Sequence, residues 1–345
     1  MSLASFKAVA EADFERLSAH MPVKELHCKT ILLTGATGFF GTWLLSLFGW
    51  LNSARQARLT VLAVSRDPAS FLTRHPGFEN TPWLVWIKGD VRSFPAPSTP
   101  VDYVIHAATD TSAEAGKTPS LLLDTIVEGT RHVLDYARQC GARRVLLISS
   151  GAVYGAQSPD VTHMDENTSS APSPLQIGHA YGVGKRVMEL LGAIYARETD
   201  AQVVIARCFA FVGAGLPLNA HFAIGNFIRD ALGAEKIAVR GGGTAERSYL
   251  YAADLAIWLA RLLVSGKSGE AYNVGSDQAL TIGDLARTVA KLLASGKEVV
   301  IEGKDDPSRG RNRYIPSIAK ARSDCQLDVW TGLDQAILLT ASYKP

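Results

Sequence analysis

Residues 30–41 have the sequence TILLTGATGFFG, and this stretch decides the fold. The apolar run at its start predicts a buried strand, and the three glycines that follow, Gly35, Gly38 and Gly41, predict a tight turn into a helix. Gly35 permits the turn, Gly38 lets backbone approach a pyrophosphate, and Gly41 allows close packing of helix on strand. The N-terminus of such a helix offers N–H groups and a partial positive charge to phosphates. The stretch therefore predicts a dinucleotide site, with a tight turn that holds no ligand as the alternative.

Apolar runs of the same kind recur along the chain, at 59–65, 84–90, 102–108, 144–150 and 202–208. They are rich in Val, Ile and Leu without strict alternation, which is typical of parallel strands buried on both faces. Helical segments are predicted between them, most clearly at 120–140 and 180–199. This alternation predicts an α/β fold with a doubly wound parallel sheet, in which ligands bind at the carboxyl ends of the strands.

The pattern predicts three parts of the chain. Residues 1–28 form an N-terminal helical extension, with apolar residues three or four apart. Residues 29–210 form the dinucleotide-binding domain, to which 250–276 return. After residue 210 the pattern loosens into glycine-rich loops, short helices and one late strand at 298–303. Residues 211–249 and 277–345 are therefore expected to form a smaller α/β domain that binds the substrate.

Composition and charge exclude several classes of protein. The 345 residues are 47% apolar and 20% charged, which excludes a disordered chain and a collagen. Lys and Arg number 35 against 33 acidic residues, and this balance argues against a nucleic-acid partner. The uncharged stretch 31–52 is interrupted by glycine and threonine, so strand–turn–helix explains it better than a membrane span.

Cysteine and histidine usage predicts no metal site and no disulfide framework. The four cysteines lie far apart without a CxxC pair, and the eight histidines form no HExxH pattern. The N-terminal residues carry acidic side chains and no apolar core of a signal peptide. A reducing compartment, and with it the cytoplasm, is therefore the expected location.

The end of the second predicted strand bears on the choice of cofactor. An acidic residue there would bind the ribose 2′-hydroxyl of NAD, whereas an arginine suits the 2′-phosphate of NADP. The chain has Ser65 and Arg66, and Asp67 comes later, so NADP is favoured over NAD, with a solvated surface charge as the other interpretation of Arg66. Asp90, at the end of the third strand, is a candidate partner of the adenine amino group. The full set expected to line the cofactor is Gly35, Thr37, Gly38, Phe39, Phe40, Gly41, Ser65, Arg66, Asp90, Val91, Ala107, Ala108, Thr109, Tyr181, Lys185 and Phe209.

Three residues form the candidate catalytic group. Tyr181 and Lys185 are four apart at the start of a predicted helix, so their side chains share one face. Ser150 closes the fifth strand, whose carboxyl end should face the same crevice. A tyrosine has an ordinary pKa near 10, and a neighbouring ammonium together with a positive nicotinamide ring would lower it. Ser150 would then hold the substrate oxygen while Tyr181 exchanges its proton and the cofactor exchanges hydride. A YxxxK motif by itself is common and usually has no catalytic role. Here its position in the sequence, after the glycine turn and Ser150, favours catalysis.

Together these segments resemble a known family. TGATGFFG (34–41), SSGAVYG (149–155), YGVGK (181–185), RSYLYAADLA (247–256) and YNVGS (272–276) are similar to the extended short-chain dehydrogenase/reductases, and more narrowly to the nucleotide-sugar epimerase/dehydratase group. The resemblance covers roughly residues 29–335. It implies a Rossmann domain, a C-terminal nucleotide-sugar domain, a Ser-Tyr-Lys triad, and a homodimer formed through the helices at 120–140 and 180–199.

The resemblance also implies substrate contacts. Arg247 matches an arginine that grips the sugar-nucleotide diphosphate, and Asn226 lies where a nucleotide-binding asparagine is common. His179 is a candidate sugar contact close to Tyr181, and Gly151 follows Ser150. In the basic run RGRNR (309–313), one of Arg309, Arg311 and Arg313 could reach a diphosphate, with a solvated surface run as the alternative. The residues expected to bind the substrate are Gly151, His179, Asn226, Arg247 and Arg311.

Departures from the family pattern narrow the reaction. Where 4,6-dehydratases carry an Asp-Glu pair after the catalytic Ser/Thr, this chain has Gly151 and Ala152. Ala152 also replaces the glutamate of UDP-glucuronate decarboxylases. Ile126 replaces an asparagine that is often found before the VxGT segment (127–130), and Ala210 replaces an asparagine that often contacts the sugar. Elimination and decarboxylation therefore lack their acid/base groups, and hydride chemistry at C4 of the sugar is expected.

The sequence thus predicts an NAD(P)-dependent nucleotide-sugar 4-epimerase or 4-ketoreductase that supplies sugars for surface polysaccharide. The alternatives are a 4,6-dehydratase with altered acid/base residues, a reductase of small carbonyl compounds, and a non-catalytic NADP-binding redox sensor. The last would have no use for Tyr181 and Lys185 at the crevice.

Overall fold

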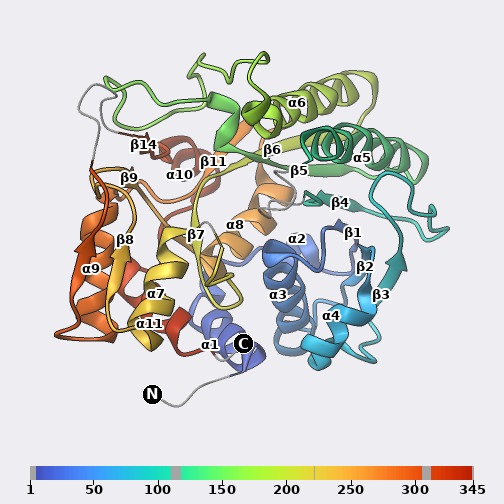
Figure 1. Ribbon diagram of the computed structural model, residues 1–345. Coiled ribbons are helices and arrows are strands. Elements are labelled where there is room, and N and C mark those ends of the chain that lie inside the picture. Colours follow the sequence, from blue (N-terminus) through green and yellow to red (C-terminus); the bar gives the residue numbers. More distant parts are fainter. Residues whose placement is uncertain (1–4, 110–117, 221, 305–311, 344–345) are drawn as a thin grey trace.

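The computed structural model describes residues 5–109, 118–220, 222–304 and 312–343. At its centre is a seven-stranded sheet in the order β11-β6-β5-β4-β1-β2-β3, in which every neighbouring pair is parallel (Figure 1). Its strands are β1 (Thr30–Thr34), β2 (Thr60–Ser65), β3 (Leu84–Lys88), β4 (Tyr103–His106), β5 (Arg144–Ser150), β6 (Gln202–Cys208) and β11 (Ala271–Val274). The six apolar runs are all strands of this sheet, and the predicted doubly wound α/β fold is confirmed.

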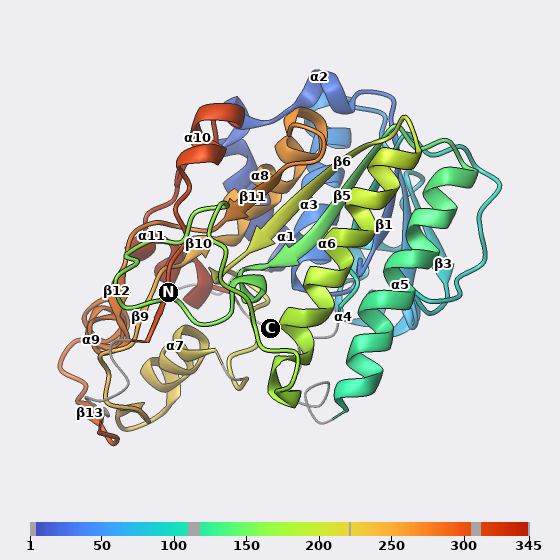
Figure 2. The ribbon, with the colours of Figure 1, turned by 90° about the horizontal axis from the view of Figure 1, so that it is seen from above.

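Helices cover both faces of the sheet (Figure 2). One face carries α5 (Pro119–Gln139) and α6 (Ala180–Glu198), and the other carries α3 (Phe39–Arg55) and α8 (Ala252–Ser265). Successive residues of a strand point to opposite faces. Leu32 of β1 accordingly packs in the same apolar cluster as Met188 of α6, whereas Ile31 and Leu33 pack in the cluster that contains α3 and α8. This burial on both faces explains why the strands lack alternation.

The N-terminal residues cap the α3 face. Helix α1 (Phe6–Arg16) is followed by η1 (Ser18–His20) and α2 (Val23–Leu26). The rings of Phe6 and Phe14 lie edge-on to Trp43 of α3, with centroids 5.1 and 6.0 Å away. The Tyr251 hydroxyl donates a hydrogen bond of 2.6 Å to the buried Asp13 carboxylate. Because α1 buries large aromatic surface, it contributes to the core of the molecule.

The remaining elements lie mostly to one side of the large sheet (Figure 1). They form three small sheets, β10-β7, β12-β9-β14 and β13-β8. The strands are β7 (Phe211–Val212), β8 (Ile237–Val239), β9 (Glu246–Arg247), β10 (Leu250–Tyr251), β12 (Leu280–Thr281), β13 (Val299–Ile301) and β14 (Arg313–Tyr314). The helices of this part are α7 (Ala223–Gly233), α9 (Ile282–Leu293), α10 (Ala319–Cys325) and α11 (Leu333–Ala341). Shorter helices in the rest of the molecule are α4 (Pro68–Arg74), η2 (Pro76–Phe78), η4 (Gly151–Tyr154) and η5 (Ile177–His179). Across the described ranges, none of the helices combines the length and the apolar character that crossing a membrane requires.

Candidate active site

The glycine turn lies at the carboxyl end of β1, where the strand order of the sheet changes direction between β1 and β4. Gly35 has φ +71°, and a side chain on it would meet the Ala107 carbonyl carbon at 2.6 Å and the Ala108 nitrogen at 2.8 Å. A side chain on Gly41 would overlap Gly35 and Ala36. The fold itself therefore requires both glycines.

Gly38 differs from the other two glycines. A side chain on it would meet only the Gly35 carbonyl oxygen, at an ordinary 3.4 Å. Gly38 is the N-cap of α3, and no side chain caps this end of the helix. Helix N–H groups without a cap are suited to a phosphate group. The turn thus fits the pyrophosphate of a dinucleotide. No neighbouring part of the protein packs closely against Gly38, so a phosphate can approach its backbone.

At the end of β2, the Asp67 carboxylate is already engaged. Asp67 caps α4 by accepting a hydrogen bond from the Ser70 N–H at 3.1 Å. Ser65 is buried and its hydroxyl lies 3.3 Å from that of Thr37, whereas Arg66 is exposed. This end of the strand therefore offers a hydroxyl and an arginine to a ribose.

Asp90, the expected adenine contact, is bound within the chain. Arg92 donates to both of its carboxylate oxygens, from Nε at 2.8 Å and from Nη2 at 3.1 Å. These hydrogen bonds lower the pKa of Asp90. An adenine would have to share this carboxylate with Arg92, which the sequence does not reveal.

Strand β5 and helix α6 bring the catalytic candidates together. Ser150 ends β5, and Tyr181 and Lys185 lie in the first turns of α6, one turn apart. The Lys185 ammonium is buried and donates to the Ile148 carbonyl at 2.7 Å and to the Thr109 hydroxyl at 2.9 Å. It lies 5.8 Å from the centre of the Tyr181 ring. Ser150 lowers the pKa of Tyr181, so the three side chains lie within reach of one another.

Burial changes the acid–base properties of this group. It lowers the pKa of Lys185 to about 8. It raises the pKa of Tyr181 to about 12, with the hydrogen bond to Ser150 offsetting part of the rise. In the protein alone, therefore, the pKa of Tyr181 is raised, because desolvation of the phenolate is the largest contribution. A positive charge brought by a cofactor would have to supply the difference.

A residue that the sequence did not point to completes the site. Tyr314 of β14 places its hydroxyl where a side chain on Gly151 would begin, 2.6 Å from the position of that Cβ, and the Phe209 ring lies 2.8 Å from it. The two rings lie against each other at an angle of 35°, with centroids 4.6 Å apart. Burial raises the pKa of Tyr314, and Ser150 offsets part of this rise. Position 151 therefore has no room for a larger side chain unless these rings move.

A charged network supports β5 from behind the triad. The Ser149 hydroxyl donates to the Glu189 carboxylate at 2.6 Å, and Arg207 of β6 binds both oxygens of Glu189. Arg207 also donates to the Tyr154 hydroxyl, which in turn donates to Asn273 of β11. Paired and nearly buried, these groups fix the strand ends on which Ser150 and Phe209 sit.

Arg247 is the clearest of the expected substrate residues. It lies on β9, is only partly exposed, and donates from Nη1 to the carbonyls of Glu246 and Asn312. In the part of the chain that the structure describes, no carboxylate forms an ion pair with it, and burial lowers its pKa. A desolvated guanidinium that contacts only carbonyl oxygens is suited to an anionic ligand.

The other residues expected to bind the substrate either form hydrogen bonds or ion pairs within the protein or lie outside the described residues. His179 donates a hydrogen bond from Nδ1 to the Ser173 carbonyl, 3.3 Å away, and Asn226 accepts one from Arg229. Arg309 and Arg311 lie outside the described residues, and Arg313 pairs with Glu246. Arg247 is thus the described basic residue of this set that keeps capacity for a ligand.

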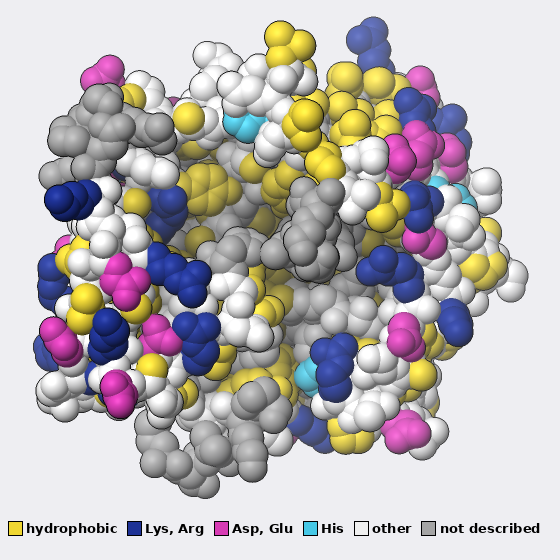
Figure 3. Space-filling model, in the orientation of Figure 1, with side chains coloured by type: hydrophobic (Ala, Val, Ile, Leu, Met, Phe, Trp, Pro, Cys, Tyr) yellow, Lys and Arg dark blue, Asp and Glu magenta, His cyan; other side chains and the backbone are white. Residues whose placement is uncertain are grey.

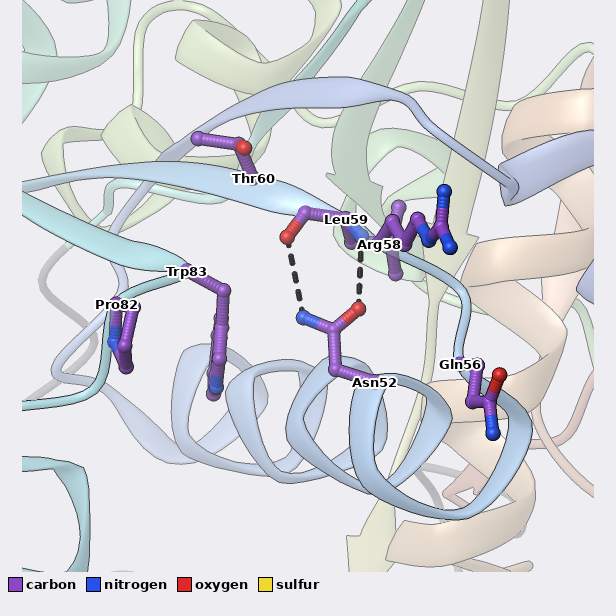
Figure 4. Close-up of a pocket in the computed structure, with 7 residues that line it drawn as sticks. All are labelled: Asn52, Gln56, Arg58, Leu59, Thr60, Pro82 and Trp83. Atoms are coloured by element: carbon purple, nitrogen blue, oxygen red, sulfur yellow. Dashed lines mark hydrogen bonds between the residues drawn. The ribbon is translucent and has the colours of Figure 1, made fainter.

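Two features of the surface lie outside this group of residues or beside it. Basic side chains gather over the region of α7, β8 and β9 (Figure 3). A hollow of about 500 Å³ lies elsewhere, at the beginning of β2, where the Asn52 amide both donates to and accepts from the Leu59 backbone (Figure 4). This hollow is at the opposite end of β2 from Ser65, so it is separate from the residues described above.

Known proteins share both the sequence pattern and the fold. Residues 31–275 match the model of the NAD dependent epimerase/dehydratase family. The chain is 31% identical over 296 residues to UDP-glucuronic acid decarboxylase 6 of Arabidopsis thaliana, which covers 85% of this chain and 82% of that one. An epimerase of Methanothermobacter thermautotrophicus has a TM-score of 0.76 at 23% identity, over 95% of each chain.

A third match is the UDP-glucuronic acid 4-epimerase of Bacillus cereus, solved in complex with NAD. It has a TM-score of 0.75 at 21% identity, over 91% of this chain and 98% of that one. The two solved structures share the Rossmann-type fold, and the family match covers most of the chain, so the expected resemblance is confirmed. This chain belongs to the NAD-dependent epimerase/dehydratase family, whose nucleotide-sugar enzymes are extended short-chain dehydrogenase/reductases.

Proposed function

We propose that this protein transfers hydride at C4 of the sugar in a nucleotide diphosphate sugar, as a 4-epimerase or a 4-ketoreductase. The observation that carries the proposal is the meeting of Ser150, Tyr181 and Lys185 at the carboxyl edge of the sheet, beside the glycine turn. The nicotinamide cofactor supplies the hydride acceptor or donor. Tyr181 exchanges the proton of the C4 oxygen, Ser150 holds that oxygen by a hydrogen bond, and the Lys185 ammonium favours the tyrosinate.

The surroundings of Gly151 argue against elimination of water. By the family resemblance, a dehydratase carries its acid at this position, but here the rings of Tyr314 and Phe209 fill the space. Ala152 likewise provides no carboxylate. The triad without an added acid is sufficient for oxidation and reduction at C4.

Decarboxylation is the second candidate, because relatives such as the Arabidopsis protein have that name. Oxidation of a glucuronic acid at C4 gives a β-keto acid, which can lose CO₂ after the same hydride step. The missing glutamate at Ala152 makes this outcome the less favoured of the two.

We further propose NADP as the preferred cofactor, although the family is described as NAD dependent. Arg66 at the end of β2 would face a 2′-phosphate, and the acid that would compete, Asp67, caps α4 instead. We propose a homodimer as well, because Leu121 of α5 and Leu190 and Ile194 of α6 expose large apolar side chains on one helical layer. The free cysteines are in keeping with a cytoplasmic protein.

The function is tested by incubating the purified protein with UDP-glucose, UDP-glucuronic acid and a nucleotide 4-keto sugar, each with NAD or NADPH. Interconversion of two sugars without net redox identifies an epimerase, and stoichiometric NADPH oxidation with the 4-keto sugar identifies a reductase. Release of CO₂ from UDP-glucuronic acid supports decarboxylation. Absence of hydride transfer with all of these substrates would contradict the proposal.

We expect Arg247→Met to raise the KM for the nucleotide sugar at least tenfold and to leave cofactor affinity unchanged. The variant keeps the apolar stem and removes the guanidinium that has no carboxylate partner among the described residues. Charge-assisted hydrogen bonds to a phosphate are worth about 1.5–3 kcal/mol. Initial rates over a range of substrate concentrations measure the effect.

Arg287→Met is the matched control, because Arg287 is exposed and pairs with Asp284 on α9. It should leave KM unchanged. An equal rise of KM in both variants would mean that Arg247 has no specific role in binding the diphosphate.

A further inference from the structure

A buried histidine that the proposed reaction does not use lies next to the glycine turn. His106 ends β4 and is fully buried, between Thr34 at the end of β1 and Thr130 of α5. Its Nδ1 atom lies 2.8 Å from the Thr34 hydroxyl, and its Nε2 atom lies 3.2 Å from the Thr130 hydroxyl. Two neighbouring strands of the sheet and one helix therefore meet at this ring.

The hydroxyl of Thr130 decides whether Nε2 carries a proton. A hydroxyl has one proton to donate and two lone pairs that accept. The Thr130 hydroxyl donates its proton to the Ile126 carbonyl, at 2.6 Å. Towards His106 it can therefore only accept, so the proton of this hydrogen bond belongs to Nε2.

The hydroxyl of Thr34 decides the state of the other ring nitrogen. Its oxygen accepts from the Ala107 N–H at 3.2 Å and from the Ala108 N–H at 3.3 Å. The Ala107 N–H is shared with the Thr34 carbonyl, also at 3.3 Å. With both lone pairs in use, the hydroxyl donates its proton to His106, and Nδ1 accepts. The ring is thus neutral, and burial, which lowers the pKa of His106 to about 3, favours the same form.

The two N–H groups that Thr34 holds belong to the backbone on which the glycine turn rests. A side chain on Gly35 would meet the Ala107 carbonyl carbon at 2.6 Å and the Ala108 nitrogen at 2.8 Å. Contact this close leaves no room for either backbone to shift independently of the other. The shape of the turn therefore depends on where the backbone of Ala107 and Ala108 is held.

The same segment continues to the lysine of the triad. The Thr109 hydroxyl accepts from the Lys185 ammonium at 2.9 Å and donates to the Ala108 carbonyl at 2.8 Å. Residues 107–109 thus connect the glycine turn to Lys185. A neutral ring suits this place, because the positive charge of Lys185 disfavours a second positive charge on His106.

We propose that His106 is a positioning residue for the cofactor site: its neutral ring accepts from Thr34 and so leaves the Thr34 oxygen free to hold the backbone of Ala107 and Ala108 against the glycine turn. This role rests on the proposed function only through its nicotinamide cofactor. An N–H at Nδ1 would face an oxygen whose lone pairs are both in use, and one of the two backbone N–H groups would lose its acceptor.

The first test measures cofactor affinity without a sugar substrate. His106→Leu removes both ring nitrogens, so the Thr34 proton and the Thr130 oxygen lose their partner. We expect the Kd for NADPH, measured by fluorescence titration with NADH in parallel, to rise about tenfold. His106→Asn carries its amide oxygen on the same γ carbon that bears Nδ1 in histidine, and this acceptor for Thr34 should recover most of the loss.

His132→Leu is the matched control. His132 is a partly buried histidine of α5 that donates from Nε2 to the Phe94 carbonyl at 2.9 Å. It should leave the Kd unchanged, even if it lowers the unfolding temperature as much as His106→Leu does. An unchanged Kd in His106→Leu, equal rises in the two leucine variants, or no recovery in His106→Asn would overturn the proposal. So would a wild type that binds neither cofactor.

A second measurement uses the wild type and needs neither cofactor nor turnover. With histidine ring nitrogens labelled by ¹⁵N, the His106 signals are assigned by their absence in His106→Asn. They should show a neutral ring with its proton on Nε2, unchanged between about pH 5 and 8, where an ordinary histidine titrates. A proton on Nδ1, or titration in this range, overturns the positioning role whatever the affinity. If tautomer and affinities are as expected but no nucleotide sugar is turned over, the proposed function fails and the role of His106 stands.

Discussion

Tyr181→Phe should lower turnover by about a thousandfold, within the range of 10² to 10⁴ that removal of a positioned acid or base causes. Phenylalanine keeps the ring beside Lys185 but has no proton to give to or take from the C4 oxygen. Tyr181 is only partly buried and the variant keeps its ring, so the substitution is not expected to unfold the chain. Single-turnover hydride transfer, followed by NADPH absorbance, measures the chemical step directly.

Tyr195→Phe is the matched control for this variant. Tyr195 lies on the same helix, is more deeply buried than Tyr181, and is near the other end of the helix from the triad. The two variants should unfold at similar temperatures and bind cofactor equally, while only Tyr181→Phe loses turnover. If Tyr181→Phe kept wild-type activity, the non-catalytic sensor considered from the sequence would become the better description.

The parts of the site that depend on local sequence were predictable. The glycine turn is one segment, and the Tyr-Lys pair is one helical turn, so spacing alone predicts the geometry of each. The serine followed from the rule that parallel strands end at one edge of a sheet. These patterns predicted both the fold and the residues that meet in it.

The remaining features depend on tertiary contacts that spacing does not encode. Tyr314 lies on a two-residue strand after a basic run, without an apolar pattern to mark it. Asp90 was expected to face adenine, but its neighbour Arg92 engages both of its oxygens. The pKa of Tyr181 depends on how deeply α6 buries it, and that depth cannot be inferred from a four-residue spacing.

Lys185→Met should lower the rate of C4 oxidation at pH 7 by at least a hundredfold, and the deficit should shrink as the pH rises. In the oxidation direction Tyr181 must lose its proton, and burial raises its pKa to about 12. Without the ammonium, the fraction of tyrosinate grows about tenfold per pH unit below that pKa. In the wild type the pKa of Lys185 is about 8, so its charge, and with it the advantage over the variant, declines above pH 8.

Lys297→Met is the matched control. Like Lys185, Lys297 donates to backbone carbonyls, in this case those of Asp230, Ala231 and Ala234, which lie away from the triad. It should leave the pH profile of oxidation unchanged. Rates between pH 6.5 and 9.5 decide the matter: the ratio of wild type to Lys185→Met should be largest at the acidic end. A ratio that stayed constant would show that Lys185 holds Ile148 and Thr109 in place without acting on Tyr181. In the reduction direction Tyr181 gives its proton instead, so the rate of Lys185→Met should not rise with pH. This difference between the two directions separates an electrostatic role of Lys185 from a general increase in rate at alkaline pH.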